Sequence, residues 1–139
     1  MGIWKKNANI NTVNASMTHM CEHLAMVITD VGEDFISGTM PVDRRTQQPM
    51  GILHGGASIA LAETLGSVAA NLACDNTQYC LGLEINANHL RPISTGHVTG
   101  TARPIHIGRN TQVWEIQIKD NQNKMTCVSR MTLAVKMIS

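Results

Sequence analysis

One carboxylate stands alone in the most apolar stretch of this 139-residue chain. Glu63 is the only acidic or basic side chain, histidine aside, between His54 and Cys74, a run rich in Ala, Leu, Gly and Ser. An ionised carboxylate is rarely buried without a partner. Two interpretations are open. Glu63 either pairs with an arginine or lies at an interface rim, or it is a reactive carboxylate that faces a pocket.

The residues around Glu63 favour the reactive interpretation. Ser67 follows it by one helical turn, so the two side chains share a face. Gly55 opens the predicted helix, where free backbone N–H groups lie at the positive end. Such donors suit a carbonyl whose oxygen gains negative charge. Gln48 and His54, just before the helix, complete the candidate catalytic set, although His54 can also be read as a helix-capping or loop histidine.

The spacing of Gly55 and Glu63 constrains how they can act together. Eight residues of helix separate their backbones by about 12 Å along the axis. A reaction needs both groups within about 3 Å of the reacting atoms. Two helices related by a two-fold axis could place Gly55 of one beside Glu63 of the other. The sequence therefore predicts a shared site, with two sites in each homodimer.

The elements that position these residues follow from the periodicity of the chain. Residues 54–74 predict one long helix that is apolar or small on nearly all sides and is therefore enclosed by other elements. Residues 10–24 predict one or two short helices, capped by Asn11 or Asn14, over a pocket mouth. Strands are predicted at residues 25–31, 34–42, 78–91, 97–107, 111–119 and 125–138, with a bulge or close approach at Gly82 and an edge or bulge at Pro104.

This order of elements predicts the fold class. Two strands, a helix and four strands lack the βα alternation of a doubly wound parallel sheet. We expect one α+β domain over residues 1–139, in which a curved antiparallel sheet wraps around one long central helix. One curved sheet leaves a flank of the helix open, so a second subunit should cover it.

Composition narrows the class of protein further. The net charge is +1, and nothing indicates a nucleic-acid or membrane partner. The four Cys show no CxxC spacing and no secretory segment is recognisable, which favours reduced thiols and a cytoplasmic location. Residues 19–23 have the spacing of an inverted zinc-peptidase motif, which needs a third protein ligand and a larger peptidase scaffold. The chain is short and no second motif follows, so no metal site is expected.

The stretch QPMGILHGGASIALAETLGS, residues 48–67, and the order of elements resemble the hotdog-fold acyl-CoA thioesterases of the phenylacetate-degradation type. The chain is most similar to the bacterial group that includes 1,4-dihydroxy-2-naphthoyl-CoA thioesterases and enterobactin proofreading thioesterases. The resemblance covers nearly the whole chain, including residues 3–6, 40–43, 84–89 and 107–109.

The resemblance implies the roles of the candidate catalytic residues. Glu63 would be the nucleophile or the base towards water, and the Gly55 N–H would polarise the thioester carbonyl. Gln48, His54 and Ser67 would position substrate or water. The substrate would be an acyl-CoA, most simply an aromatic one of the hydroxynaphthoyl or hydroxybenzoyl type, as in menaquinone biosynthesis. No cofactor is implied, because coenzyme A is part of the substrate, and the active unit would be a homodimer assembled into a homotetramer.

The resemblance also places coenzyme A. Its implied binding residues are Gly82, His89, Leu90, Arg91, Pro92, His106, Ile107, Gly108, Arg109, Asn110 and Thr111. The residues themselves single out Arg91 and Arg109, because the forked guanidinium suits phosphate; solvated surface charge is the alternative for each. Met50 stands where similar proteins usually carry Phe, which leaves the acyl preference open.

Three other functions fit parts of the pattern. The chain could be a proofreading hydrolase for thioesters of an acyl or aryl carrier protein, which would then be a partner. It could be a hotdog dehydratase that pairs His54 with Glu63, or an acyl-CoA sensor without catalysis. Gln48 and the HGG sequence before Glu63 favour hydrolysis over dehydration, and a sensor would need no isolated carboxylate in the helix.

Overall fold

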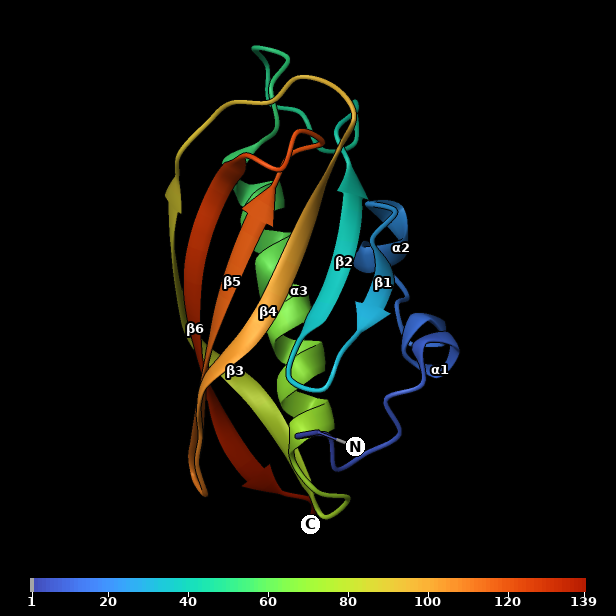
Figure 1. Cartoon of the computed structure of the whole chain (residues 1–139), viewed down its shortest axis with the longest axis vertical. Helices are drawn as coiled ribbons and strands as arrows, with labels where there is room; N and C mark the ends of the chain where they lie inside the picture. Colours follow the sequence, from blue (N-terminus) through green and yellow to red (C-terminus); the bar gives the residue numbers. More distant parts are fainter. Residues whose placement is uncertain (1) are drawn as a thin grey trace.

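The computed structural model describes residues 2–139, in which three helices and six strands are found (Figure 1). In chain order these are α1 (Ile10–Ala15), α2 (Met20–His23), β1 (Val27–Val31), β2 (Ile36–Pro41), α3 (Gly55–Ala73), β3 (Gln78–His89), β4 (His97–Ile107), β5 (Thr111–Lys119) and β6 (Met125–Met137).

The strands form one curved sheet that wraps around α3, as the sequence predicts (Figure 1). Their spatial order is β1-β2-β4-β5-β6-β3, and every neighbouring pair is antiparallel. Strand β5 shows the pattern most clearly, because buried and partly exposed residues alternate along its length. Its buried face, which includes Trp114, Ile116 and Ile118, is turned towards α3 and forms the core.

Leu65 determines how closely α3 approaches the sheet. Gly38 of β2 and Gly100 of β4 are direct partners in the sheet register. A Cβ on Gly38 would lie 2.9 Å from Leu65 Cδ2, and one on Gly100 would lie 2.6 Å from Leu65 Cδ1. The two glycines therefore form a hole that receives the Leu65 side chain, which is fully buried.

Both predicted irregularities in the strands are present. The register of β3 against β6 shifts between Gly82 and Glu84, which confirms the bulge. The register of β4 against β5 shifts between Pro104 and His106. Since β2 pairs with β4 only as far as Ala102, Pro104 lies beyond it and needs no hydrogen bond on that side.

One prediction about the helices is wrong in detail. The cap of α1 is Asn9, whose side chain accepts hydrogen bonds from the backbone N–H groups of Asn11 and Thr12. Asn14 instead pairs with the backbone of Ile28 in β1.

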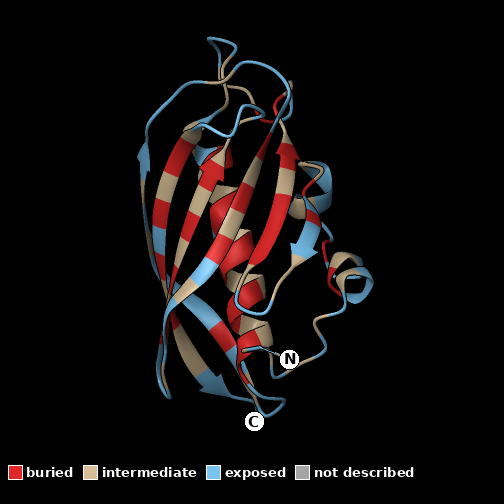
Figure 2. Ribbon diagram, in the orientation of Figure 1, coloured by how far each residue is buried: buried red, intermediate tan, exposed pale blue. Residues whose placement is uncertain are grey.

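Helix α3 is open on one flank, as expected for a helix covered by one curved sheet. Its sheet-facing residues are buried, but Glu63 is exposed, because in one chain the sheet covers only one side of the helix (Figure 2).

No helix within residues 2–139 has the length and apolar character needed to cross a membrane.

Replacing Leu65 with Ala should lower the free energy of unfolding by about 2–5 kcal/mol, because it leaves a cavity over the two glycines. Ile138 is 57% exposed and serves as the control. Ile138→Ala should change the free energy by less than about 0.5 kcal/mol. Urea denaturation monitored by circular dichroism measures both. Equal effects would show that Leu65 does not anchor the helix.

Candidate active site

His54 caps α3 and thereby determines which backbone donor remains free. Its Nδ1 accepts a hydrogen bond from the Gly56 N–H at 2.8 Å, and its carbonyl accepts one from the Ala57 N–H at 2.9 Å. Within residues 2–139, no acceptor is found for the N–H of Gly55. Of the first three residues of the helix, Gly55 therefore presents the unused donor, at the positive end of the helix.

The capping bond also assigns the tautomer of His54. Because Nδ1 is an acceptor, the proton of the neutral imidazole lies on Nε2. The interpretation of His54 as a helix-capping histidine is confirmed. Its Nε2–H stays available as a donor, so capping does not exclude a contact with substrate.

A tight turn brings Gln48 to the same end of α3. Pro49 and Met50 occupy the centre of the turn, which is closed by a hydrogen bond of 2.9 Å from the Gly51 N–H to the Gln48 carbonyl. Gly51 has a φ of +82°, which favours glycine. The Oε1 of Gln48 accepts from the Met50 N–H. The Gln48 Nε2 has no acceptor among residues 2–139 and is left to donate to a ligand.

Gly55 and Gln48 share a cavity of about 360 Å³. The segment that follows β3 forms its opposite wall. The lining residues are Gln48, Ile52, Leu53, Gly55, Ser58, His89, Leu90, Arg91, Pro92 and Thr126. The structure therefore brings two predicted catalytic residues together with one of the predicted coenzyme A segments, residues 89–92.

His89 lies directly against Gly55. A Cβ built on Gly55 would be 2.9 Å from His89 Nε2 and 3.2 Å from its Cε1. A Cβ at residue 55 would therefore force the His89 imidazole to shift. The ring in turn limits where the first residue of α3, and with it the free N–H, can lie.

Glu63 lies in a different cavity, of about 340 Å³, between α3 and α2. The residues that line it are Met20, Cys21, Met26, Gly56, Ile59, Ala60, Glu63 and Thr64. The Oε2 of Glu63 is 3.4 Å from the position a Cβ would take on Gly82 of β3. Gly82 thus lies beside the carboxylate, and the Glu63 side chain is exposed.

Ser67 lines a third cavity, of about 350 Å³, between α3, α1 and the segment before α1. Its lining residues are Lys6, Asn7, Thr12, Val13, Ser16, Ser67, Val68, Asn71 and Leu72. Ser67 is one turn beyond Glu63 on the same face of α3, as the sequence predicts. The cavities of Glu63 and Ser67 therefore follow one another along the helix.

Residues 106–111 lie at the other end of α3, where a turn joins β4 to β5 (Figure 1). The next residue, Gln112, donates through Nε2 to the Ala70 carbonyl at 3.4 Å. Gly55 and Ala70 are about 22 Å apart along the helix axis. One chain therefore does not bring residues 106–111 to the Gly55 cavity, and the predicted coenzyme A residues fall into separate segments.

Some lining residues were not identified from the sequence. Ser58 could have been found, because it follows Gly55 by three residues and shares its helical face. Thr126 could not, since its place depends on the chain pairing beyond β3. There the Leu90 N–H donates to the Thr126 carbonyl at 2.8 Å.

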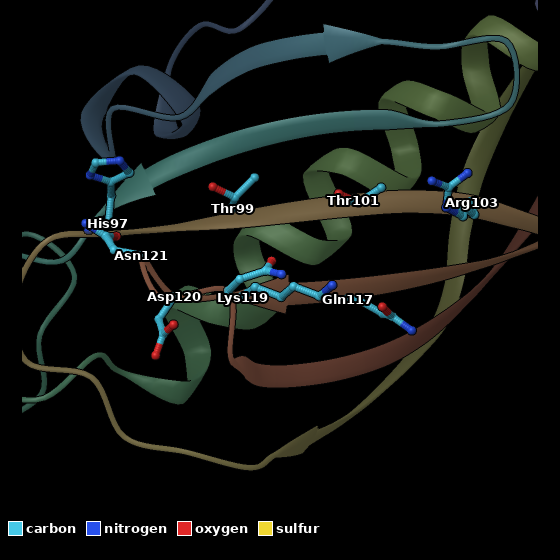
Figure 3. Close-up of a pocket in the computed structure, with 9 residues that line it drawn as sticks. His97, Thr99, Thr101, Arg103, Gln117, Lys119, Asp120 and Asn121 are labelled. Carbon is cyan, nitrogen blue, oxygen red and sulfur yellow. The ribbon is translucent and has the colours of Figure 1, made fainter.

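A larger groove, of about 540 Å³, lies on the face of β4 and β5 turned away from α3 (Figure 3). It is lined by His97, Thr99, Thr101, Arg103, Gln117, Lys119, Asp120, Asn121 and Asn123. Its strand residues alternate with buried ones such as Val98 and Ile118. The sheet separates this groove from Gly55 and Glu63, so it belongs to neither part of the candidate site.

Among residues 2–139, no group of three or more His, Cys, Asp or Glu side chains is arranged to hold a metal ion. His19 and His23 therefore lack the further ligands that a protein zinc site needs.

Comparison with known proteins identifies the family. Residues 50–127 match the profile of the Thioesterase superfamily. A Vibrio cholerae relative named as an esterase is 56% identical over 137 residues, which are 98% of this chain and 91% of the relative. The proofreading thioesterase EntH of Cronobacter sakazakii is 49% identical, over 96% of this chain and 98% of its own. The crystal structure of a Haemophilus influenzae thioesterase matches with a TM-score of 0.95 at 50% identity, covering 97% of this chain and 95% of that one.

The fold is that of the hotdog thioesterases, and the class of protein is a thioester hydrolase. The chain belongs to the thioesterase superfamily.

Gly55→Ala should lower kcat for thioester hydrolysis by about 100-fold, because the new Cβ presses on His89 and displaces the free N–H. Adding His89→Ala should restore a large part of this loss, with His89→Ala alone as the control. Thiol release at saturating substrate measures all three. A double variant no more active than Gly55→Ala would show that His89 is not the reason for glycine at position 55.

Proposed function

We propose that this chain hydrolyses acyl-CoA thioesters in a site built by two subunits. Gly55 and Gln48 come from one subunit, and Glu63 and Ser67 from its partner. The separation of Gly55 and Glu63 carries this proposal, because they line different cavities of one chain. Both lie on one rigid helix, about 12 Å apart along its axis. A second copy of α3 is the simplest source of the missing half.

The exposed edge of strand β3 favours a second copy of this chain as the partner. It pairs with β6 on one side only, and Figure 2 shows it exposed along most of its length. Leu81 and Leu83 are 51% and 64% exposed. A long edge strand with exposed apolar side chains readily pairs with another strand. Pairing of two β3 strands would bring Gly82 and the adjacent Glu63 to the interface, and two such dimers would form the expected homotetramer.

The chemistry follows from the free groups. The Gly55 N–H and Gln48 Nε2 donate to the carbonyl oxygen of the thioester as it gains negative charge. Glu63 of the partner subunit attacks the carbonyl carbon or takes a proton from the attacking water. Coenzyme A leaves as a thiolate without a strong acid, because an ordinary thiol has a pKa of only about 8.5. The proposal needs no cofactor.

The cavity beside Ser67 favours a substrate with a bulky acyl group. Its wall includes the apolar side chains of Val13, Val68 and Leu72, and it begins one turn from Glu63. An apolar ring bound there would be removed from water. We therefore favour aromatic acyl groups of the hydroxybenzoyl or hydroxynaphthoyl type. The second would place the enzyme in menaquinone biosynthesis.

The cations suggest how coenzyme A enters. Arg91 lines the Gly55 cavity and can bind phosphate through its forked donors. Arg109 follows β4 at the far end of the helix. It would contact the same coenzyme A only from another subunit of the assembly.

A carrier-protein thioester is the second candidate substrate. The relative named as a proofreading thioesterase directs attention to it. The N–H groups of Lys124 and Gln122 hold the pKa of Asp120 below its usual range, and the positive charges of Arg91 and Lys124 add to this effect. Arg91 lines the Gly55 cavity, and a positive charge at that position would attract an acidic carrier protein.

Mixed dimers test the shared site. Gln48→Ala and Glu63→Gln homodimers should each be nearly inactive. A purified heterodimer of the two should regain about half of the wild-type activity, because one of its two sites then has no substitution. Thiol release measures this. A site within one subunit would leave the heterodimer as inactive as its parents.

A substrate panel tests the chemistry and the acyl group. It contains benzoyl-CoA, a hydroxynaphthoyl-CoA, a medium-chain acyl-CoA and an aryl carrier-protein thioester. We expect the bicyclic aromatic thioester to react fastest, and Glu63→Gln to lower its hydrolysis by about 100- to 10,000-fold. Fastest release from the carrier protein would favour the second candidate. Unchanged hydrolysis in Glu63→Gln would reject the assigned role of Glu63.

A further inference from the structure

Two buried cysteines meet at the C-terminal end of α3, away from the candidate active site. Cys74 is the C-cap of the helix and Cys80 lies in β3; they are 3% and 5% exposed. Their Sγ atoms donate to successive helix carbonyls, Cys74 to Asn71 and Cys80 to Ala70, each at 3.5 Å. The two thiols thus point at the same turn of α3.

The Asn71 side chain holds the two cysteines in this arrangement. Its Oδ1 accepts from the Cys80 N–H at 2.8 Å, and its Nδ2 donates to the Cys80 carbonyl at 3.2 Å. This pair of bonds ties the start of β3 to the last turn of the helix. The thiols are therefore neighbours in the folded chain, and no unfolding is needed to bring them together.

The chain adds a cation beside one of the two sulfur atoms. Lys6 Nζ donates to Cys74 Sγ at 3.5 Å and to the Gln78 carbonyl at 2.8 Å. Reactive cysteines typically lie beside a lysine, arginine or histidine side chain. Burial first, and then the Cys74 thiol, raise the pKa of Cys80 to about 12. The pair is asymmetric in its contacts, because Lys6 Nζ hydrogen-bonds to the sulfur of Cys74 and acts on Cys80 only through its charge, a smaller effect that lowers the Cys80 pKa.

The other two cysteines lack this environment. Burial alone raises the pKa of Cys127, and Cys21 contacts the hydroxyl of Thr64 at 3.9 Å. Among residues 2–139, neither has a lysine or a second thiol as a hydrogen-bond partner. They serve as internal controls.

We propose that Cys74 and Cys80 are a dithiol that a hydroperoxide oxidises to an intramolecular disulfide, with Lys6 as the group that activates Cys74. The Cys74 thiolate attacks one oxygen of hydrogen peroxide and becomes a sulfenic acid, and the released hydroxide takes up the proton lost by the thiol to form water. The Cys80 sulfur then attacks the Cys74 sulfur, and the Cys80 proton leaves with the sulfenic hydroxyl as a second water. Two thiols are oxidised and one peroxide is reduced to two waters.

The cavity that Ser67 lines lies next to the surroundings of the pair. Lys6 and Asn71, the two side chains that contact these cysteines, line it, although the cysteines themselves do not. The segment that carries Lys6 is bound to the last turns of α3 through Leu72, whose carbonyl accepts from Lys5 N–H at 2.8 Å and Lys6 N–H at 3.2 Å. A disulfide would join the end of α3 to β3 two residues before Gly82.

Peroxide treatment of the full-length reduced protein, followed by mass spectrometry, tests the proposal. We expect the loss of two hydrogen atoms, protection of Cys74 and Cys80 from alkylation in denaturant, and a peptide pair linked through them that a dithiol reductant separates. Cys74→Ser and Cys80→Ala should each abolish the link, whereas Cys127→Ser should not. Lys6→Met should slow its formation by about tenfold, with Lys5→Met as the matched control without effect.

The result of this experiment does not depend on hydrolytic activity, because only the mass of the protein and the alkylation of its cysteines are measured. Oxygen addition to Cys74 without a link, or full alkylation of both cysteines after peroxide, would overturn the proposal. The Lys6 variants keep both thiols, so they remain informative if a cysteine variant fails to fold. Equal rates in Lys6→Met and wild type would overturn the role of Lys6.

Discussion

The close approach of α3 to the sheet is the constraint on which the rest of this structure depends. Leu65 enters the hole between Gly38 and Gly100, which face each other on adjacent strands. Met131 of β6 is similarly placed, since its Sδ and Cε lie 2.8 Å from the positions of a Cβ on Gly66 and Gly82. Glycine at these points lets large side chains of the core fill the space between helix and sheet. A Cβ added at any of these four glycines would force the side chain that fills the space to shift.

Because α3 is packed so closely against the sheet, its chemically important groups lie at fixed distances along the helix axis. The free N–H of Gly55 lies at its first residue, Glu63 two turns later, and the Cys74 thiol just past its end. A straight helix cannot bring the two groups that we propose as catalytic into one site. In the proposed mechanism, the need for a second subunit therefore follows from the same packing that stabilises the monomer, and the open flank of α3 and the edge of β3 are the proposed binding surfaces.

The segment before β1 forms part of the wall of two cavities along α3. Helix α2 supplies Met20 and Cys21 to the cavity of Glu63, and α1 supplies Thr12 and Val13 to the cavity of Ser67. Trp4 stacks on Trp114 with ring centroids 6.2 Å apart, which anchors this segment on the core. The acyl-binding surface in the proposal is therefore made by short helices whose own stability depends on tertiary contacts.

The sequence by itself determined the order and type of the elements, because long periodic segments such as residues 54–74 and 111–119 leave little choice of structure. It also singled out Glu63 as a lone carboxylate and the helix start at Gly55 as a donor. Only the tertiary structure decided that His54 consumes the Gly56 N–H and leaves that of Gly55 free, that His89 packs on Gly55, and that the predicted coenzyme A residues lie at opposite ends of α3. Those facts depend on strand order and on contacts between residues far apart in the chain, which no local pattern encodes.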